Sequence, residues 1–149
     1  VFEALECHGG PGYIEESIMP RLYREAPLNS IWEGSGNVMC LDVLRALQRD
    51  KNALPALFRE LASAKGSNKN FDESFSHLKE TLQDPIDLEI EARLLTEKMA
   101  CLIQASIFIK SGEEEKVSAF CNSRLGPRWS GAFGTLPTDT SFEYIMGGL

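Results

Sequence analysis

One glutamate, Glu33, stands where a carboxylate could act as a base. It follows an apolar pair, Ile31 and Trp32, and precedes a Gly-Ser-Gly segment, so we expect it in a strained turn that leads into a helix. An aromatic wall takes water away from a carboxylate and favours its protonated form, which suits proton transfer near neutral pH. From spacing alone, the alternative is a solvated glutamate in a loop ahead of a helix.

Three motifs near the start of the chain carry a resemblance when they are taken in order. They are Gly9-Gly10-x-Gly12-Tyr13, Pro20-Arg21-x-x-Arg24-Glu25-Ala26 and Ile31-Trp32-Glu33-Gly34-Ser35. Together they resemble the C-terminal signature of the acyl-CoA dehydrogenase family of flavoproteins. The segments LYREAPLNSIWEGSGNVMCLDVLRAL and RWSGAFGTLP most resemble the alkylation-response branch, the AidB-like flavoproteins. The likeness covers nearly the whole chain but only the end of the family's protein, so we expect a C-terminal fragment.

The resemblance implies roles for five of the matching residues. Glu33 matches the family glutamate that removes the α-proton of an acyl-CoA thioester while the β-hydrogen leaves as hydride to FAD. Ser35 and Asn37 match positions at a helix start that hold the flavin, and free N–H groups there attract phosphate. Ser35 could instead only cap its helix. Gly9 and Gly10 match a glycine pair that approaches the cofactor phosphates, in many members across a subunit interface.

Two residues depart from the family pattern. Glu6 stands where many members place a glutamine that contacts flavin, so its charge would face a phosphate-bearing cofactor or turn away from it. Trp32 replaces the more usual tyrosine of the acyl pocket, and its larger ring predicts a narrower pocket and a poor dehydrogenase. Arg24 matches an arginine that we expect to be structural.

The same resemblance implies binding of double-stranded DNA by the C-terminal helical region, but charge gives this little support. The chain has a net charge of −7, and residues 52–149 hold 10 Lys or Arg against 14 Asp or Glu. Phosphate recognition needs clustered positive charge. Any duplex contact must come from a local patch, for which Lys116, Arg124 and Arg128 are the candidates; the alternative is that these are solvated charges.

Apolar spacing predicts helices through almost the whole chain and no strand. The fold class is therefore all-α, and the resemblance implies the end of an acyl-CoA dehydrogenase-type four-helix bundle over residues 1–51, followed by a smaller helical extension over residues 52–149. We expect Ala26 to be extended because it precedes Pro27. Asn70 and Glu73 are a candidate capping pair for the helix that Asp84-Pro85 ends.

The longest predicted helix runs from Ile86 to Lys110, with a packing seam at alternating steps of four and three. The seam consists of Leu88, Ala92, Leu95, Met99, Leu102, Ser106 and Ile109. Gly112 ends it, and the acidic run 113–115 begins the next helix. We expect residues 126–137 to fold back as a loop anchored by Trp129 and Phe133. Thr138 or Asp139 would cap a last short helix.

Four widely spaced cysteines and two histidines predict neither a zinc site nor a disulfide framework, and they favour reduced thiols in a cytoplasmic protein. We expect the full-length protein to be an FAD-dependent enzyme that acts on an acyl-CoA or a related thioester as a homo-oligomer. Two rival functions remain at this stage. One is a DNA-associated protective flavoprotein with incidental dehydrogenase activity, and the other is a helical oligomerisation module.

Overall fold

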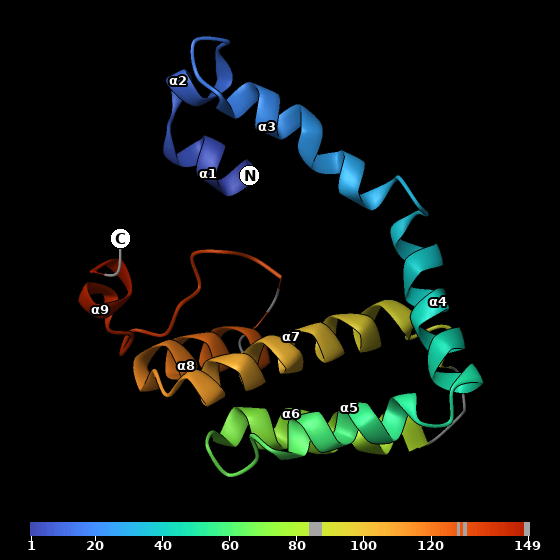
Figure 1. The fold of residues 1–149 in the computed structure, drawn as a ribbon. Helices are drawn as coiled ribbons and strands as arrows, with labels where there is room; N and C mark the ends of the chain where they lie inside the picture. The colour runs from blue at the N-terminus through green and yellow to red at the C-terminus, as the bar shows by residue number, and fades with distance from the viewer. Residues whose placement is uncertain (84–87, 128, 130, 148–149) are drawn as a thin grey trace. The chain divides into compact units, whose positions relative to one another are not determined.

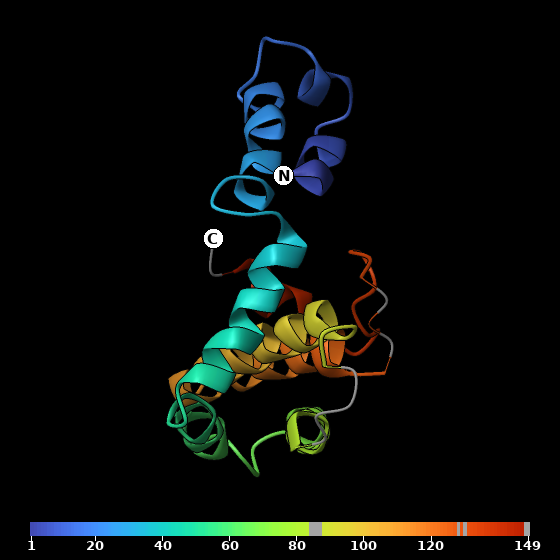
Figure 2. The same cartoon turned by 90° about the vertical axis from the view of Figure 1, so that its right-hand side faces the viewer.

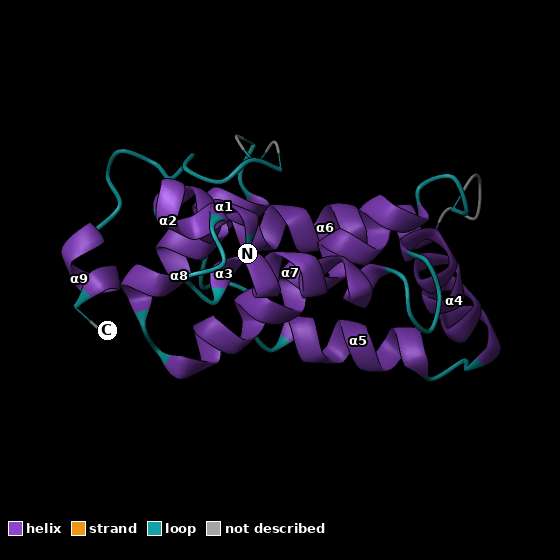
Figure 3. Cartoon of the chain, turned by 90° about the horizontal axis from the view of Figure 1, so that it is seen from above, coloured by secondary structure: helices purple, strands orange, loops and turns teal. Residues whose placement is uncertain are grey.

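The computed structural model describes residues 1–83, 88–127, 129 and 131–147. Within these ranges the backbone forms helices, turns and loops without a strand (Figure 3), which confirms the all-α prediction. The chain divides into two compact units, residues 1–39 and 40–149. The predicted domain boundary at residues 51 and 52 is a different division, and it stays a prediction. No helix in the described ranges is both long and apolar enough to cross a bilayer.

The first unit is built from three short helices and a 3-10 turn: α1 (Phe2–Cys7), α2 (Gly10–Tyr13), α3 (Met19–Glu25) and η1 (Ala26–Ser30). The three α-helices pack on one another, and Met19 is buried among them. Gly12 permits the close approach of α1 and α2, because a Cβ at this position would lie 2.3 Å from the carbonyl oxygen of Leu5. Glycine is thus required here by packing.

The prediction of an extended Ala26 is wrong. Ala26 has φ −54° and ψ −41°, which is helical, and its N–H donates to the carbonyl oxygen of Leu22. The chain therefore passes from α3 into η1 without a break. Pro27 falls in the first turn of η1.

The second unit continues α4 (Gly36–Arg49), which begins in the first unit, and adds α5 (Ala53–Ala62), α6 (Lys69–Gln83), α7 (Ala92–Ser111), α8 (Glu114–Phe120), the π-helix η2 (Cys121–Leu125) and α9 (Phe142–Met146). Figure 1 shows α5 and α6 running side by side below α7, and the view along their axes in Figure 2 places α7 and α8 on one side of the pair. Helix α7 packs against α5, α6 and α8, so it is the centre of this unit.

The predicted seam of α7 is confirmed. Leu95, Met99 and Leu102 are buried together with Ala92 and Ser106, and the remaining seam residues are half-buried against the core. Across the interface lie Leu61 of α5 and the apolar stripe of α6, which comprises Phe71, Phe75, Leu78 and Leu82. Fully burying a leucine or phenylalanine stabilises a fold by about 1.5–3 kcal/mol, so this seam is the main source of the unit's stability.

Helix ends follow the predictions in part. Gly112 ends α7 in the left-handed conformation with φ 76°, and the acidic residues of the first turn of α8 are in place, as predicted. The capping pair Asn70 and Glu73 is wrong. The side-chain oxygen of Asn68 caps α6 instead, accepting from the N–H of Asn70 at 2.9 Å and that of Phe71 at 3.3 Å.

The structure also bears on the expected boundaries around α7 and α9. The start of the longest helix at Ile86 and the stop at Asp84-Pro85 lie outside the described residues, and residues 88–91 form a turn ahead of α7. The residue at the N-cap of α9 is Ser141 rather than Thr138 or Asp139.

Candidate functional site

The turn that carries Glu33 is set by the end of η1. The backbone N–H groups of Ile31 and Trp32 both donate to the carbonyl oxygen of Leu28, at 2.9 and 3.0 Å. These two hydrogen bonds close the 3-10 turn ahead of α4. Glu33 takes φ 63°, and it is the one non-glycine residue of the described chain with a positive φ. Gly34 follows with φ 132°. The predicted strained turn is therefore present.

The expected aromatic screen around Glu33 is not supplied by the described part of this chain. The Glu33 side chain is exposed, and its neighbours Ile31 and Trp32 keep 65% and 58% of their surface open to solvent. Glu33 and Trp32 line none of the five principal cavities found among the described residues. The expectation that this chain partly screens the carboxylate from water is wrong, because Trp32 points its apolar surface outward instead of folding over its neighbour.

The two sets of predicted flavin contacts lie apart. Ser35 and Asn37 are exposed at the start of α4, directly after the Glu33 turn. Gly9, with φ 63°, and Gly10 begin α2, and a Cβ at either glycine would meet nothing within 4 Å. Figure 1 shows that α3 and η1 separate α2 from the Glu33 turn. One copy of the first unit therefore does not bring these two sets together.

Arg24 has the structural role expected for it. Its guanidinium makes a two-pronged ion pair with the carboxylate of Glu15, at 2.6 and 3.2 Å, which ties α3 to the loop after α2. The hydrogen bonds from Arg24 lower the pKa of Glu15. Both side chains are exposed, so the pair fixes the geometry of the loop more than it adds stability. Glu6 is exposed at the end of α1.

Two of the three candidates for DNA contact make contacts within the protein. Lys116 pairs with Glu113 at 2.5 Å. The guanidinium of Arg124 lies over the rings of Trp129 and Phe133, 4.1 and 4.6 Å from their centroids. Arg128 lies outside the described residues. Lys116 and Arg124 line one common cavity. Duplex binding stays a prediction, and the described residues show no free basic face formed by these candidates.

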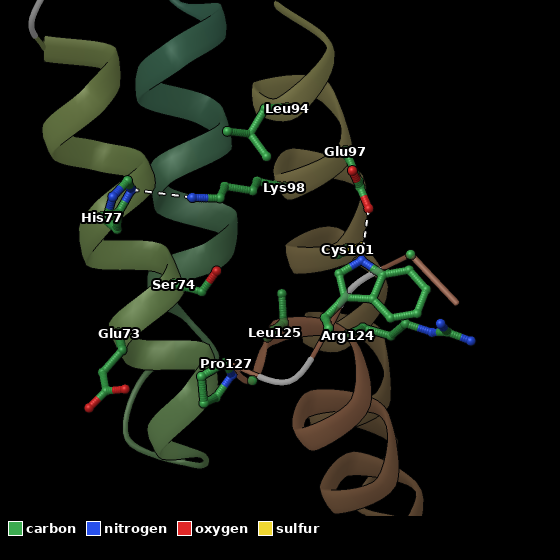
Figure 4. Close-up of a pocket in the computed structure, with 13 residues that line it drawn as sticks. Glu73, Ser74, His77, Leu94, Glu97, Lys98, Cys101, Arg124, Leu125 and Pro127 are labelled. Atoms are coloured by element: carbon green, nitrogen blue, oxygen red, sulfur yellow. Dashed lines mark hydrogen bonds between the residues drawn. The ribbon is translucent and has the colours of Figure 1, made fainter. Parts of the chain in front are cut away.

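The tail returns to the helices as predicted, through its aromatic residues. The indole N–H of Trp129 donates to the Glu97 carboxylate on α7 at 2.9 Å. Beside this contact lies a polar cavity between α6 and α7 (Figure 4). Lys98 donates to Nδ1 of His77 across it at 3.4 Å. Sequence reasoning missed this group, because three segments far apart in the chain contribute to it and none has a motif.

Burial and charge suppress the reactivity of two of the thiols around α7. Burial raises the pKa of the Cys121 thiol to about 11. Desolvation and the nearby Glu97 carboxylate also raise the pKa of Cys101, against a smaller opposing effect of Arg124. All four cysteines are free thiols, and Cys7 is the exposed one.

Comparison with known proteins defines the class to which the first unit and nearly all of α4 belong. The family model described as "Acyl-CoA dehydrogenase, C-terminal domain" matches residues 1–48. Residues 1–48 thus belong to the C-terminal domain of the acyl-CoA dehydrogenase family, as the sequence motifs predicted.

Two curated relatives extend the likeness beyond that domain. The chain is 41% identical over 128 residues to the putative acyl-CoA dehydrogenase AidB of Escherichia coli K12, a match that covers 86% of this chain and 23% of the relative. It is 38% identical over 86 residues to acyl-CoA dehydrogenase family member 11 of Caenorhabditis elegans, covering 58% of this chain and 14% of that protein. The chain is therefore AidB-like, and it spans less than a quarter of the length of the curated relatives it matches.

Proposed function

We propose that this chain supplies the C-terminal helical segment of an FAD-dependent acyl-CoA dehydrogenase-like flavoprotein in which Glu33 removes the α-proton of an acyl-CoA thioester. The observation that carries the proposal is the backbone of Glu33, the one non-glycine residue with positive φ in the described chain. A left-handed residue costs about 1–2 kcal/mol, and strain of this kind clusters at functional sites. The family match of residues 1–48 supports the same reading.

The surroundings of Glu33 leave its carboxylate free to accept a proton from a bound substrate. Its carboxylate has no hydrogen-bond or ion-pair partner within the described residues, so it can accept a proton without first breaking a contact. Ile31 and Trp32 present apolar surface on either side of the backbone turn. Polypeptide or substrate that covers this surface would take water from the carboxylate and strengthen it as a base.

The first unit also offers contacts that fit a phosphate-bearing cofactor. Ser35 and the first N–H groups of α4 form an exposed helix N-terminus, the kind of site that attracts phosphate oxygens. Gly9 and Gly10 leave open space in front of their backbone, so a phosphate could approach it closely. When bound, FAD would accept the hydride that leaves the β-carbon of the substrate.

The separation of these two contact sets leads us to propose a homo-oligomer. Because α3 and η1 lie between the glycine pair and the Glu33 turn, we expect Gly9 and Gly10 of one copy to face a cofactor held at Ser35 and Asn37 of another. The first unit then contributes to two active sites, one through each end.

The test is anaerobic titration of the complete flavoprotein with acyl-CoA thioesters of several chain lengths, read as loss of the oxidised flavin absorbance. We expect bleaching by the parent protein and none by Glu33→Gln at equal flavin content. Glu16→Gln, an exposed glutamate of the same unit, is the matched control and should bleach like the parent. Equal bleaching by Glu33→Gln and the parent protein would refute the assignment of the base.

A further inference from the structure

A second cavity, lined only by residues of the second unit, has a composition unlike that of the Glu33 turn. It lies between α7, α8 and the returning tail, and its volume is about 640 Å³, within the range of roughly 300–1,000 Å³ that is usual for small-molecule sites. Its walls are mainly apolar and come from Phe108, Ala119, Phe120, Phe133, Leu136 and Ile145. Such walls suit an alkyl chain.

The charged groups of this cavity have one sign. Lys116 and Arg124 line it, and no carboxylate does so among the described residues. Lys116 forms an ion pair with Glu113, a residue that does not line this cavity. Arg124 has no hydrogen-bond acceptor or ion-pair partner within the described part of the chain, although its side chain is half-buried. Its charge is in contact with two aromatic rings, and its N–H donors have no acceptor among the described residues, so a carboxylate could accept from them.

The direction in which Arg124 can bind is set by its neighbours. The rings of Trp129 and Phe133, at 4.1 and 4.6 Å, lie against the guanidinium. The N–H donors of a guanidinium lie along its edge, which is where a planar carboxylate binds. In Figure 4 the Arg124 side chain runs away from His77 and Lys98 of the neighbouring polar cavity. Arg124 also lines that neighbouring cavity, so its side chain lies on the wall that the two cavities share.

An independent feature of the backbone points to the same place. Arg124 belongs to η2, a five-residue π-helix that continues directly from α8. Short π-helical segments are rare and are found frequently at functional sites. The wider turn brings both Ser123 and Arg124 to the cavity wall.

We propose that this cavity binds a single-chain anionic amphiphile, whose alkyl chain lies against the phenylalanine walls while the edge of Arg124 holds its carboxylate. Lys116 contributes a second, weaker attraction because it is shared with Glu113. The ligand is a monomer in solution, not a lipid of a membrane surface. The site is independent of Glu33 and of the proposed dehydrogenation.

The experiment uses laurate as the probe and the full 149-residue chain carrying Trp32→Phe, so that Trp129 reports on the cavity. Laurate is added below its critical micelle concentration, and its carboxylate signal is followed in parallel by NMR with carbonyl-labelled ligand. Dodecanol tests the role of charge, and vesicles of an anionic phospholipid test a membrane surface. Far-UV circular dichroism confirms that each variant is folded.

We expect saturable laurate binding that weakens at least tenfold in Arg124→Gln, about threefold in Lys116→Gln and not at all in Lys79→Gln, an exposed lysine of α6 that serves as the matched control. Arg124→Lys keeps the charge but loses the planar edge of the guanidinium, so it should bind laurate more weakly than the parent and more tightly than Arg124→Gln. Dodecanol should bind at least tenfold more weakly than laurate. The proposal is overturned by equal binding of dodecanol and laurate, by unchanged binding in Arg124→Gln, or by binding to vesicles without binding of monomeric laurate.

Discussion

Replacing Glu33 by glycine should make the first unit more stable even though it removes the proposed base. The left-handed conformation costs a residue with a Cβ about 1–2 kcal/mol. Glycine escapes this cost, but it loses roughly 0.4–1 kcal/mol more conformational freedom on folding. No side-chain contact is lost, because Glu33 is exposed and makes none within the described residues. The balance is a gain of about 1 kcal/mol.

Glu33→Gln is the matched comparison. It keeps the Cβ and therefore the strain, so we expect its free energy of unfolding to stay within about 0.5 kcal/mol of the parent, the usual range for exposed positions. The two variants thus separate the strain of the backbone from the chemistry of the carboxylate. Both should lack α-proton removal, while only the glycine variant should gain stability.

The assay is urea unfolding of the 149-residue chain in a Trp129→Phe background, where the fluorescence of Trp32 reports on the first unit. With a urea dependence of about 1–3 kcal/mol per molar for small proteins, a gain of 1 kcal/mol raises the midpoint by roughly 0.3–1 M. A glycine variant whose midpoint equals or falls below that of Glu33→Gln would refute the strain argument. Such a result would mean that the left-handed backbone of Glu33 does not carry a strain of about 1–2 kcal/mol.

Three further predictions concern the second unit and its thiols. At pH 8 an alkylating reagent should label Cys7 first and Cys121 last, because a pKa of about 11 leaves Cys121 roughly 100-fold less thiolate than an ordinary cysteine. The ratio of the two labelling rates should narrow steadily as the pH rises from about 9 toward 11. Equal labelling rates at pH 8, read by mass spectrometry, would contradict the burial of Cys121. Leu102→Ala should lower the free energy of unfolding by about 3–5 kcal/mol, since Leu102 is fully buried in the α7 seam; a loss below about 1 kcal/mol in urea titrations would place this residue outside the core. Asn68→Ala should lower the free energy of unfolding by about 1 kcal/mol, because the Asn68 side chain caps α6. Glu73→Ala should lower it by less than about 0.5 kcal/mol. A larger loss in Glu73→Ala than in Asn68→Ala, measured by urea titration, would instead support the capping pair expected from sequence.

The helices of this chain were predictable where periodicity decides burial. The seam of α7 requires apolar or small residues at steps of three and four, and Leu95, Met99 and Leu102 are buried as their spacing indicated. Gly112 was equally clear, because a left-handed helix end favours glycine. These features depend on local chemistry and on one repeating contact.

Other features were not predictable because they depend on choices between equivalent local partners. Asn68 and Asn70 stand two residues apart, and either side chain could cap α6. Only the packing of the loop selects Asn68, and the amide of Asn70 instead donates to Asn122 of η2 at 2.7 Å. Ala26 likewise follows the continuation of α3 rather than the usual preference of a residue before proline.

The sequence allowed us to predict which residues form the candidate site, but not how exposed those residues are or what they contact. Sequence identified Glu33 and the turn that strains it, and the family match agrees with the motif that contains it. Sequence could not reveal that Ile31 and Trp32 lie open to solvent, because the partner of an apolar surface is set by tertiary contacts. Nor could it show Arg124 between two rings, since Trp129 and Phe133 reach it only through the fold of the tail.

The removal of a proton by Glu33 can be measured most directly as exchange of the α-hydrogens of an acyl-CoA in D₂O. The complete flavoprotein is incubated anaerobically with the thioester, and the loss of the α-proton signal is followed by NMR. We predict enzyme-dependent exchange with the parent protein and with Glu16→Gln, and at least a hundredfold slower exchange with Glu33→Gln at equal flavin content, in line with the contribution of a general base. Exchange by Glu33→Gln at the parent rate would show that another group takes the proton and would contradict the central claim.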